Sequence, residues 1–284
     1  MSAQTTLAGK TILMSGGSRG IGLAIAVRAA RDGANVAIMA KTDQPHPKLP
    51  GTIHTAVAEI EAAGGKGLGI VGDVRDDDAI DAAVARTVTA FGGIDVCVNN
   101  ASAINISKTP DLPPKAYDLM QDINTRGTFM LSRACIPHLE SSANAHILTL
   151  SPPINLDPKW AGGQLGYTIA KYGMSLCTLG LAEELKDRAI AANSLWPRTL
   201  IATAAVMNLL GGEKAMNQSR TPEIVADAAH AILTRPAAEC TGNFFIDDEV
   251  LAEEGVTDVD RYNAGSGTPL VDLFLEGAYG PVGT

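Results

Sequence analysis

The chain alternates short, continuously apolar runs with segments whose apolar residues recur at helical spacing. The apolar runs at 11–16, 35–40 and 67–74 are typical of strands buried on both faces of a sheet. The segments between them, 20–33 and 51–65, end at glycine, which is favoured just beyond a helix C-terminus. The pattern therefore predicts strands and helices in strict alternation.

The same alternation continues to about residue 247. We expect further helices and strands, in chain order, at 77–93, 94–100, 115–139, 146–151, 166–188, 189–196, 222–234 and 242–247. Apolar strands alternating with helices predict a doubly wound α/β fold of the Rossmann type, a parallel sheet of about seven strands with helices on both faces. We expect one domain over 1–284, with a core of about 8–247. The extension 248–284 either covers an edge of the sheet or is partly mobile.

Three segments interrupt the rhythm, at 41–51, 151–165 and 197–220. Each follows a predicted strand, so all three are expected at the carboxyl edge of the sheet, where open α/β sheets bind ligands. We interpret them as walls of a cofactor and substrate site; the alternative is that they are simple connections.

A glycine-rich string, Ser15–Gly22, lies between the first predicted strand and the first predicted helix. Gly16 permits a tight turn, Gly20 lets the backbone approach a phosphate, and Gly22 lets the helix pack near the strand. The helix N-terminus then offers free N–H groups and a positive dipole end to a diphosphate. The string therefore predicts a dinucleotide site.

The end of the second predicted strand indicates which dinucleotide binds. A site for NAD usually has an acidic residue there to hold the ribose hydroxyl, but this chain has Ala40 followed by Lys41. Lys41 and Arg19 could pair with the additional phosphate of NADP. Asp43 could instead reach back to a hydroxyl, which would favour NAD. We predict NADP, with NAD as the less favoured cofactor.

A tyrosine and a lysine, Tyr167 and Lys171, are four residues apart in a predicted helix and so share one face. Tyrosine titrates near pH 10, too high for proton transfer near neutrality. A nearby ammonium group lowers that pKa, so the tyrosine can pass a proton to or from a substrate oxygen. The pair predicts the acid/base group of a nicotinamide-dependent reaction.

The overall composition narrows the range of partners. A formal net charge of −9 disfavours nucleic acid and anionic membranes, which both require a basic face. No apolar run reaches the roughly 18 residues of a membrane span, and no signal peptide is evident, so we expect a cytoplasmic protein. The four cysteines are scattered and the five histidines lie apart, so we expect reduced thiols and no metal site.

The order of these features resembles the short-chain dehydrogenase/reductase family. A glycine-rich loop is followed by Asn99–Ser102 after the fourth strand, Asn124, a strand ending at Ser151, and the Tyr167 and Lys171 pair. The resemblance covers about residues 8–247. It implies a Rossmann fold, a nicotinamide cofactor and oxidoreductase activity on a carbonyl or alcohol. Longer relatives carry a sterol-carrier domain, which we expect to be absent because the sequence stops at 284.

The resemblance also implies roles at matched positions. Tyr167 would be the acid/base, Lys171 would lower its pKa and hold the nicotinamide ribose, and Asn124 would hold a water in a proton relay. Asp73 would contact the adenine and Asn100 the adenine ribose. The full set implied at the cofactor is Gly16, Ser18, Arg19, Gly20, Ile21, Gly22, Lys41, Asp73, Val74, Asn100, Lys171 and Pro197.

One position departs from the family pattern in a way that affects the chemistry. The family's catalytic serine falls on Pro152, one residue after Ser151, and the loop from there to Tyr167 is longer than usual. Either Ser151 contacts the substrate oxygen or Asn155 takes that role, and we include Ser151 among the candidate catalytic residues.

These features predict an NADP(H)-dependent oxidoreductase for a small apolar or lipid-like substrate. Two alternatives are a cofactor-binding regulatory protein with little catalysis, which the altered serine region favours, and a hydratase or epimerase, which would cause no net change in nicotinamide absorbance. The long helices 115–139 and 166–188 match family helices that pack across a twofold axis, so we also expect a homodimer or homotetramer.

Overall fold

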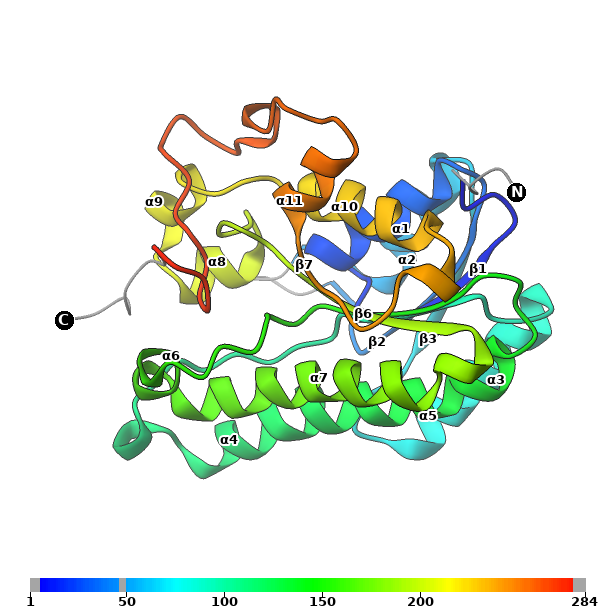
Figure 1. Ribbon diagram of the computed structural model, residues 1–284, viewed down its shortest axis with the longest axis horizontal. Helices are drawn as coiled ribbons and strands as arrows, with labels where there is room; N and C mark the ends of the chain where they lie inside the picture. Colours follow the sequence, from blue (N-terminus) through cyan, green and yellow to red (C-terminus); the bar gives the residue numbers. More distant parts are fainter. Residues whose placement is uncertain (1–5, 46–49, 278–284) are drawn as a thin grey trace.

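The structure, a computed structural model, describes residues 6–45 and 50–277 and contains a parallel sheet in the order β3-β2-β1-β4-β5-β6-β7 (Figure 1). The strands are β1 (Thr11–Ser15), β2 (Asn35–Ala40), β3 (Lys66–Val71), β4 (Val96–Asn99), β5 (Ala145–Thr149), β6 (Ile190–Trp196) and β7 (Phe244–Ile246). The larger helices are α1 (Gly20–Ala30), α2 (Ile53–Ala62), α3 (Asp77–Phe91), α5 (Gly127–Leu139), α7 (Leu165–Glu184) and α10 (Glu223–Thr234). The predicted doubly wound α/β fold is confirmed.

Helices cover both faces of the sheet, which is why its strands are apolar on both sides. On β1, Ile12 and Met14 pack with α1, α2 and α10, whereas Leu13 packs with α3, α5 and α7. This division follows from the two-residue period of a strand. Figure 1 shows the two helical layers, with α1 and α10 on one side and α5 and α7 on the other.

The strand order reverses at β1, which pairs with β2 on one side and with β4 on the other. Ser15, the last residue of β1, lies opposite Met39 and Asn99. The loops that leave β1 and β4 therefore start side by side at the carboxyl edge. In open α/β sheets this reversal creates the crevice in which ligands bind.

Two predictions about local structure were incomplete. The helix expected at 115–139 consists of α4 (Pro114–Met120), a π-helical segment η2 (Gln121–Arg126) and α5. The interrupting segments contain the short helices α6 (Pro158–Gly163), α8 (Ala204–Leu209) and α9 (Gly212–Asn217). Helices of six residues span fewer than two turns, so they leave no recognisable period in the sequence.

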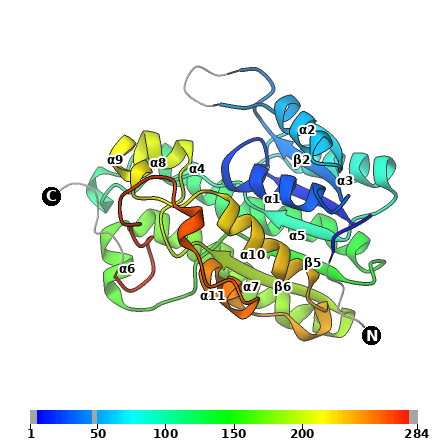
Figure 2. The ribbon, with the colours of Figure 1, turned by 90° about the horizontal axis from the view of Figure 1, so that it is seen from above.

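The C-terminal extension forms helix α11 (Asp247–Glu253) and then returns across the carboxyl edge. Val271 forms an antiparallel bridge with Thr199, just beyond β6. In Figures 1 and 2 this returning segment, coloured red, runs between α6 on one side and α8 and α9 on the other. The described part of the extension therefore covers the sheet edge, which is one of the two outcomes expected for it.

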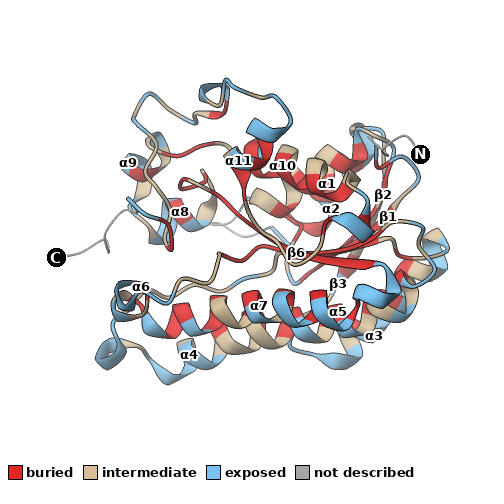
Figure 3. Ribbon diagram, in the orientation of Figure 1, coloured by how far each residue is buried: buried red, intermediate tan, exposed pale blue. Residues whose placement is uncertain are grey.

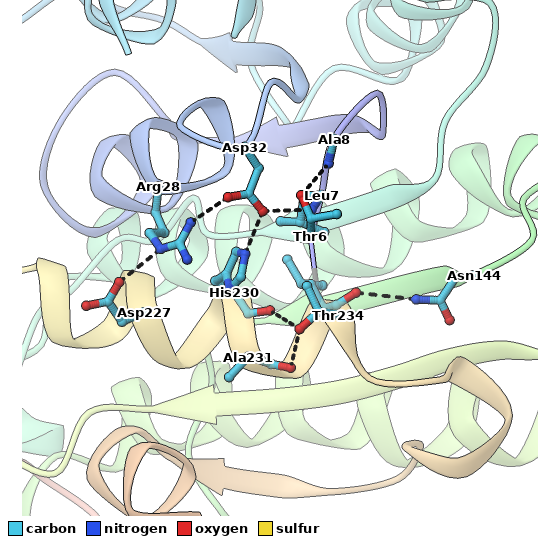
Figure 4. A network of polar contacts seen from close by, with 11 residues as sticks. Thr6, Leu7, Ala8, Arg28, Asp32, Asn144, Asp227, His230, Ala231 and Thr234 are labelled. Atoms are coloured by element: carbon cyan, nitrogen blue, oxygen red, sulfur yellow. Dashed lines mark hydrogen bonds and ion pairs between the residues drawn. The ribbon is translucent and has the colours of Figure 1, made fainter. Parts of the chain in front are cut away.

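A polar network ties α1 to α10 (Figure 4). Asp32 accepts hydrogen bonds from Leu7 N (2.8 Å) and Arg28 Nη1 (3.1 Å), and lies 2.8 Å from His230 Nε2. Arg28 also donates to Asp227 Oδ1 at 3.1 Å. Burial by itself would raise the pKa of Asp32, but its partners outweigh burial and lower this pKa to about 2. The network holds the helix that carries the glycine-rich loop.

Candidate active site

The glycine-rich loop is held so close to the loop after β4 that side chains are excluded from it. Gly16 and Gly20 have φ of +75° and +57°, in the left-handed region that favours glycine. A Cβ atom on Gly16 would lie 2.9 Å from Ala101 Cα, and one on Gly22 would lie 2.5 Å from Asn100 Nδ2. The turn at Gly16 and the close packing at Gly22 thus have a direct steric basis.

Asn100 joins the loops after β1 and β4 by hydrogen bonds. Its Nδ2 donates to Ser15 O at 3.2 Å and to Gly16 O at 2.8 Å. The hydroxyl of Ser15 accepts from the backbone N–H groups of Asn100 and Ala101, each at 3.2 Å. The turn that would approach a diphosphate is therefore fixed before any ligand binds.

A cleft of about 1440 Å³ runs along this edge of the sheet. The predicted cofactor residues that line it are Gly16, Ser18, Arg19, Gly20, Ile21, Lys41, Asp73, Val74 and Asn100. The first turn of α1 has neither a side-chain cap nor an acidic residue, so its N–H groups remain available to an anion. Gly22, Lys171 and Pro197 lie outside this lining, with Pro197 buried after β6.

Basic side chains gather where the cleft passes the end of β2. Arg19 donates to Pro50 O and Gly51 O, both at 2.9 Å, while Lys41 lies 3.5 Å from Asp73. Hydrogen bonding from the Arg75 side chain is the main cause that lowers the pKa of Asp73, so this carboxylate is ionised.

Asp43, the residue that would have favoured NAD, has other partners. It lies 2.6 Å from His54 Nε2 and accepts from Gln44. It does not belong to the described lining of the cleft.

Tyr167 and Lys171 lie on the buried face of α7 (Figure 3), only 5% and 3% exposed. Lys171 Nζ donates to Leu150 O at 2.9 Å and lies 5.2 Å from the centre of the Trp196 ring. The Tyr167 hydroxyl makes no hydrogen bond to any residue of 6–45 or 50–277. Packing therefore orients Tyr167, whereas Lys171 is oriented both by packing and by its hydrogen bond to Leu150 O.

The charges of this pair are set mainly by burial. Burial lowers the pKa of Lys171 to about 7, against the opposing effect of the Asp272 carboxylate. Burial also raises the pKa of Tyr167 well above its usual value, and the charge of Asp272 raises it further. The pKa of Asp272 is itself raised to about 7 by burial. In this arrangement Tyr167 is protonated and can act as a proton donor.

Asn124 lies within the π-helical segment η2, a distortion often found at functional sites. Its side chain accepts from Ala103 N at 2.7 Å and donates to Ala103 O at 2.9 Å. Ala103 lines the cleft and also packs against the cluster that contains Tyr167. Asn124 therefore positions the backbone that separates the two parts of the site.

The structure does not bring the candidate serine to Tyr167. Ser151 is fully buried, and its hydroxyl lies 2.9 Å from that of Ser194, which donates to Thr178. Thr178 is about three helical turns along α7 from Tyr167. The alternative residue, Asn155, uses its side-chain oxygen to accept from Asp157 N. Pro152 stands at the family's serine position and has no hydroxyl to offer in its place.

An aromatic cage, made of Trp160, Tyr167, Tyr172 and Trp196, surrounds Phe274 of the C-terminal segment. The ring centres lie 6.2, 6.1, 5.3 and 5.9 Å from that of Phe274, in that order. Phe274 and Asp272 were not predicted as site residues. The one signal for them was an apolar run, Leu270–Leu275, within an otherwise glycine-rich, acidic tail.

Neither a membrane-spanning helix nor a metal-binding cluster is found in the described part of the chain. Within residues 6–45 and 50–277, no helix combines the length and apolarity needed to cross a bilayer. The same residues contain no group of three or more His, Cys, Asp and Glu side chains arranged for a metal ion.

Comparison with known proteins agrees with this arrangement. The family model for short chain dehydrogenases matches residues 10–213. Hydroxysteroid dehydrogenase-like protein 2 of Xenopus tropicalis is 58% identical over 271 residues, which are 95% of this chain and 64% of that protein. The chain thus spans less than two thirds of the length of that relative.

Two solved structures are similar in fold and sequence. A short chain dehydrogenase from Mycobacterium thermoresistibile is 58% identical, with a TM-score of 0.90 over 97% of this chain and 98% of that one. An NADH-dependent reductase responsible for alginate metabolism is 25% identical, with a TM-score of 0.68 over 84% and 96%. The chain belongs to the short-chain dehydrogenase family, a family of nicotinamide-dependent oxidoreductases.

Proposed function

We propose that this chain is an NADP(H)-dependent oxidoreductase that acts on a carbonyl or alcohol of a small apolar or lipid-like substrate, with Tyr167 as acid/base. The placement of Tyr167 and Lys171 carries the proposal. Both lie on the buried face of α7, and the cluster that contains Tyr167 packs against Ala103 and Ile104, which also line the cofactor cleft. The pair and the dinucleotide site are thus separated by a single loop.

The residues around the cleft suit a dinucleotide. The glycine loop packs directly against Asn100 and Ala101, where Cβ atoms would collide, and the uncapped N-terminus of α1 supplies N–H donors. Gly16, Ser18, Gly20, Ile21 and Asn100 would hold the diphosphate and adenine ribose. When bound, the nicotinamide would supply the hydride acceptor or donor.

Tyr167 would transfer the proton that accompanies hydride movement. During reduction its hydroxyl gives a proton to the developing alkoxide, and during oxidation the phenolate takes one from the alcohol. Lys171, when charged, stabilises the phenolate, and its bond to Leu150 O holds the ammonium group in place. Asn124 would act through Ala103, as a positioning residue, and could hold a water in the relay.

Lys41 and Arg19 support NADP as the preferred cofactor. Both line the cleft at the end of β2, where a carboxylate would otherwise hold a ribose hydroxyl. Asp73, 3.5 Å from Lys41, partly neutralises this charge. An NADH-dependent relative shows that family membership alone does not decide the cofactor.

Titration with NADPH and NADH tests the cofactor preference. We expect NADPH to bind more tightly, and Lys41→Ala to weaken NADPH by about 10-fold with little change for NADH. Tighter binding of NADH by the unmodified chain, or unchanged NADPH binding by Lys41→Ala, would contradict the preference.

A panel of apolar ketones and aldehydes, incubated with the preferred cofactor, tests the reaction class. The proposal predicts oxidation of NADPH in proportion to the carbonyl consumed. Product formed without a change in nicotinamide absorbance would indicate a hydratase or epimerase instead.

A regulatory protein with little catalysis is the second candidate. The buried hydroxyl of Ser151 and the covering of Tyr167 by Phe274 favour it. It predicts cofactor binding without turnover of any carbonyl in the panel.

We further propose that the chain forms a homodimer or homotetramer through α5 and α7. Apolar side chains stand exposed along one face of α7 and on α5, namely Leu165, Ile169, Leu176, Leu179 and Phe129. A contiguous apolar surface of this kind is uncommon on monomers. Light scattering should give a dimer or tetramer at micromolar concentration, and Leu176→Glu should lower the mass; a monomeric unmodified chain would contradict this.

A further inference from the structure

The aromatic cage and the C-terminal segment that fills it come from distant parts of the chain. Trp160 lies on α6, Tyr167 and Tyr172 on α7, and Trp196 at the end of β6. Figures 1 and 2 both show the C-terminal segment entering the space between α6 and α8. Phe274 therefore joins elements that are more than 70 residues away in the sequence.

The segment Leu270–Glu276, which we name the strap, is held by a few contacts. Leu270 O accepts from Leu200 N at 2.9 Å, and Asp272 N donates to Arg198 O at 3.0 Å. Leu273 O accepts from Trp196 Nε1 at 3.0 Å. Beyond these bonds, Lys159 pairs with Glu276 at the surface, at 2.7 Å.

Phe274 combines complete burial with an unusual backbone. Its side chain is 1% exposed, yet its φ is +70°, in the left-handed region that residues other than glycine rarely adopt. Such a conformation costs free energy and persists only where packing maintains it. The aromatic cage therefore holds the strap in a strained state, which a competing occupant of the cage would relieve.

Phe274 occupies space beside the Tyr167 ring, which is 5% exposed. The cofactor cleft reaches Ala103 and Ile104, but its described lining includes neither Tyr167 nor Lys171. The two ring centres of Tyr167 and Phe274 are 6.1 Å apart. A substrate whose oxygen is to meet the Tyr167 hydroxyl needs room that Phe274 and the strap now take.

The cage also contains a buried donor without a partner in the described part of the chain. Trp160 Nε1 is buried and has no hydrogen-bond acceptor within residues 6–45 and 50–277. Buried donors of this kind are rare because the missing bond costs free energy. The apolar neighbours of the cage include Ile106 and Leu112. A ligand that suits this space is a flat apolar group that carries a hydrogen-bond acceptor.

We propose that Phe274 occupies the substrate position beside Tyr167, and that an apolar, ring-sized carbonyl or alcohol displaces it on binding. The proposal rests on the function proposed above and names the substrate class of that site. It makes Phe274 a specificity-determining residue, because a substrate must replace the ring contacts that it removes. Small polar carbonyls, which gain little from the cage, would not displace it.

Displacement would also change the charges at the pair. Asp272, on the strap, faces Tyr167 and Lys171 from one side, and its carboxylate raises the pKa of both. Asp247 on α11 is the other acidic group that acts on Asp272. Moving the strap outward would take the Asp272 charge away from both groups, which lowers the pKa of Tyr167 and that of Lys171 alike.

The test uses the intrinsic fluorescence of the full chain with its cofactor bound. The chain has two tryptophans, Trp160 and Trp196, and both belong to the cage. The probe is 2-acetonaphthone, an aromatic ketone that quenches tryptophan on binding. A closed strap lowers the apparent affinity by the fraction of open molecules, so Phe274→Ala should bind the ketone about 10-fold more tightly than the unmodified chain. Phe274→Leu, which keeps most of the apolar volume, should show a smaller gain.

Phe245→Ala is the matched control, because Phe245 packs on the opposite face of the sheet. It should bind the ketone like the unmodified chain. Equal affinities of folded Phe274→Ala, Phe245→Ala and the unmodified chain would overturn the proposal. If ketone binding tightens in Phe274→Ala but no variant reduces any carbonyl, the strap assignment stands and the proposed function fails. If the unmodified chain reduces ketones but Phe274→Ala binds them no better, the proposed function stands and the strap assignment fails.

A milder variant covers the case in which Phe274→Ala and Phe274→Leu do not fold. Glu276→Gln removes the surface pair with Lys159, and Glu183→Gln removes a comparable pair with Lys186 away from the strap. The Glu276 and Glu183 side chains are 76% and 75% exposed. Acrylamide quenching of the two tryptophans should rise about 2-fold in Glu276→Gln only, since an exposed pair contributes little. No rise, or an equal rise in both variants, would contradict a strap that opens.

Discussion

At the carboxyl edge, the cofactor side, which is the cleft beside the glycine-rich loop, and the proposed substrate side, which is the aromatic cage, are built in different ways. On the cofactor side, Gly16 and Gly22 press against Asn100 and Ala101, and hydrogen bonds from Asn100 fix the turn. On the substrate side, the contacts are between side chains of α6, α7, β6 and the strap, centred on Phe274. The first side is an open cleft, whereas the second is filled by the chain itself.

The difference shows which features of the site can vary. Where the backbone of two loops is in direct contact, as at Gly16 and Gly22, few substitutions are possible because an added side chain would collide with the neighbouring loop. A cage of side chains can be altered residue by residue, and its occupant can be exchanged. In our proposal, the fold thus carries a dinucleotide cleft beside a substrate site whose shape depends on loops and on the strap.

The largest effect is expected from Gly22→Ala. Alanine is favoured over glycine in a helix by about 1 kcal/mol, but its Cβ would lie 2.5 Å from Asn100 Nδ2 and 2.8 Å from Gly16 O. We expect NADPH affinity, measured by titration, to fall by at least about 100-fold. Gly93→Ala, where an added Cβ meets no atom within 4 Å, is the control and should bind normally. Normal NADPH binding by Gly22→Ala would show that the cofactor side tolerates added side chains, which contradicts the difference drawn between the two sides.

Asn124→Ala should have an intermediate effect and should affect both sides. It removes two partly buried hydrogen bonds to Ala103, so a backbone N–H and C=O lose their partner. The free energy of unfolding should fall by about 2–3 kcal/mol in denaturant titrations. Asn208→Ala, at an exposed position of α8, should change it by less than about 0.5 kcal/mol. Equal stability of the two variants would show that the hydrogen bonds of Asn124 do not stabilise the backbone at Ala103, between the cleft and the aromatic cage.

A smaller, pH-dependent effect is expected from Asp32→Asn, far from the aromatic cage. Because the pKa of Asp32 is lowered to about 2 in the folded chain, its contribution is complete above the unfolded value of about 4. The contribution is lost as the pH falls through the folded value. Asp32→Asn should therefore cost about 1–2 kcal/mol in the free energy of unfolding at pH 6, and the difference should shrink toward pH 2.

The control for this measurement is Asp81→Asn, at an exposed position of α3. Its stability should follow that of the unmodified chain at every pH. A constant difference between Asp32→Asn and the unmodified chain from pH 6 to pH 2 would show that the network with Arg28 and His230 does not depend on the charge of Asp32.

Most of the fold, and most residues that line the cleft beside the glycine-rich loop, could be predicted because their signals are local. Apolar strands and helices ended by glycine show the alternation directly, and the string from Ser15 to Gly22 carries its own chemistry. The short helices α8 and α9 could not be found, because their stability comes from packing rather than from a period. Their segment had been expected to form a wall, and Thr203 and Met207 do line the cleft.

The substrate side was harder to predict because its contacts are distant in sequence. Phe274 meets Tyr167 only through the path that the extension takes across the sheet edge. The orientation of Ser151 was also not predictable from the sequence. A hydroxyl at the end of β5 could face the ligand or the core, and only the structure places it against Ser194.

The most direct measurement is the turnover of Tyr167→Phe on an apolar ketone, at saturating NADPH. This change removes the hydroxyl and keeps the ring that packs against Phe274. Tyr172→Phe, in the same helix and the same cage, removes a hydroxyl that donates to Asn155 O and is the control. We predict that kcat falls at least about 100-fold in Tyr167→Phe and less than about 3-fold in Tyr172→Phe, with the Kd for NADPH unchanged in both. Turnover by Tyr167→Phe equal to that of the unmodified chain would contradict the assignment of Tyr167 as the acid/base.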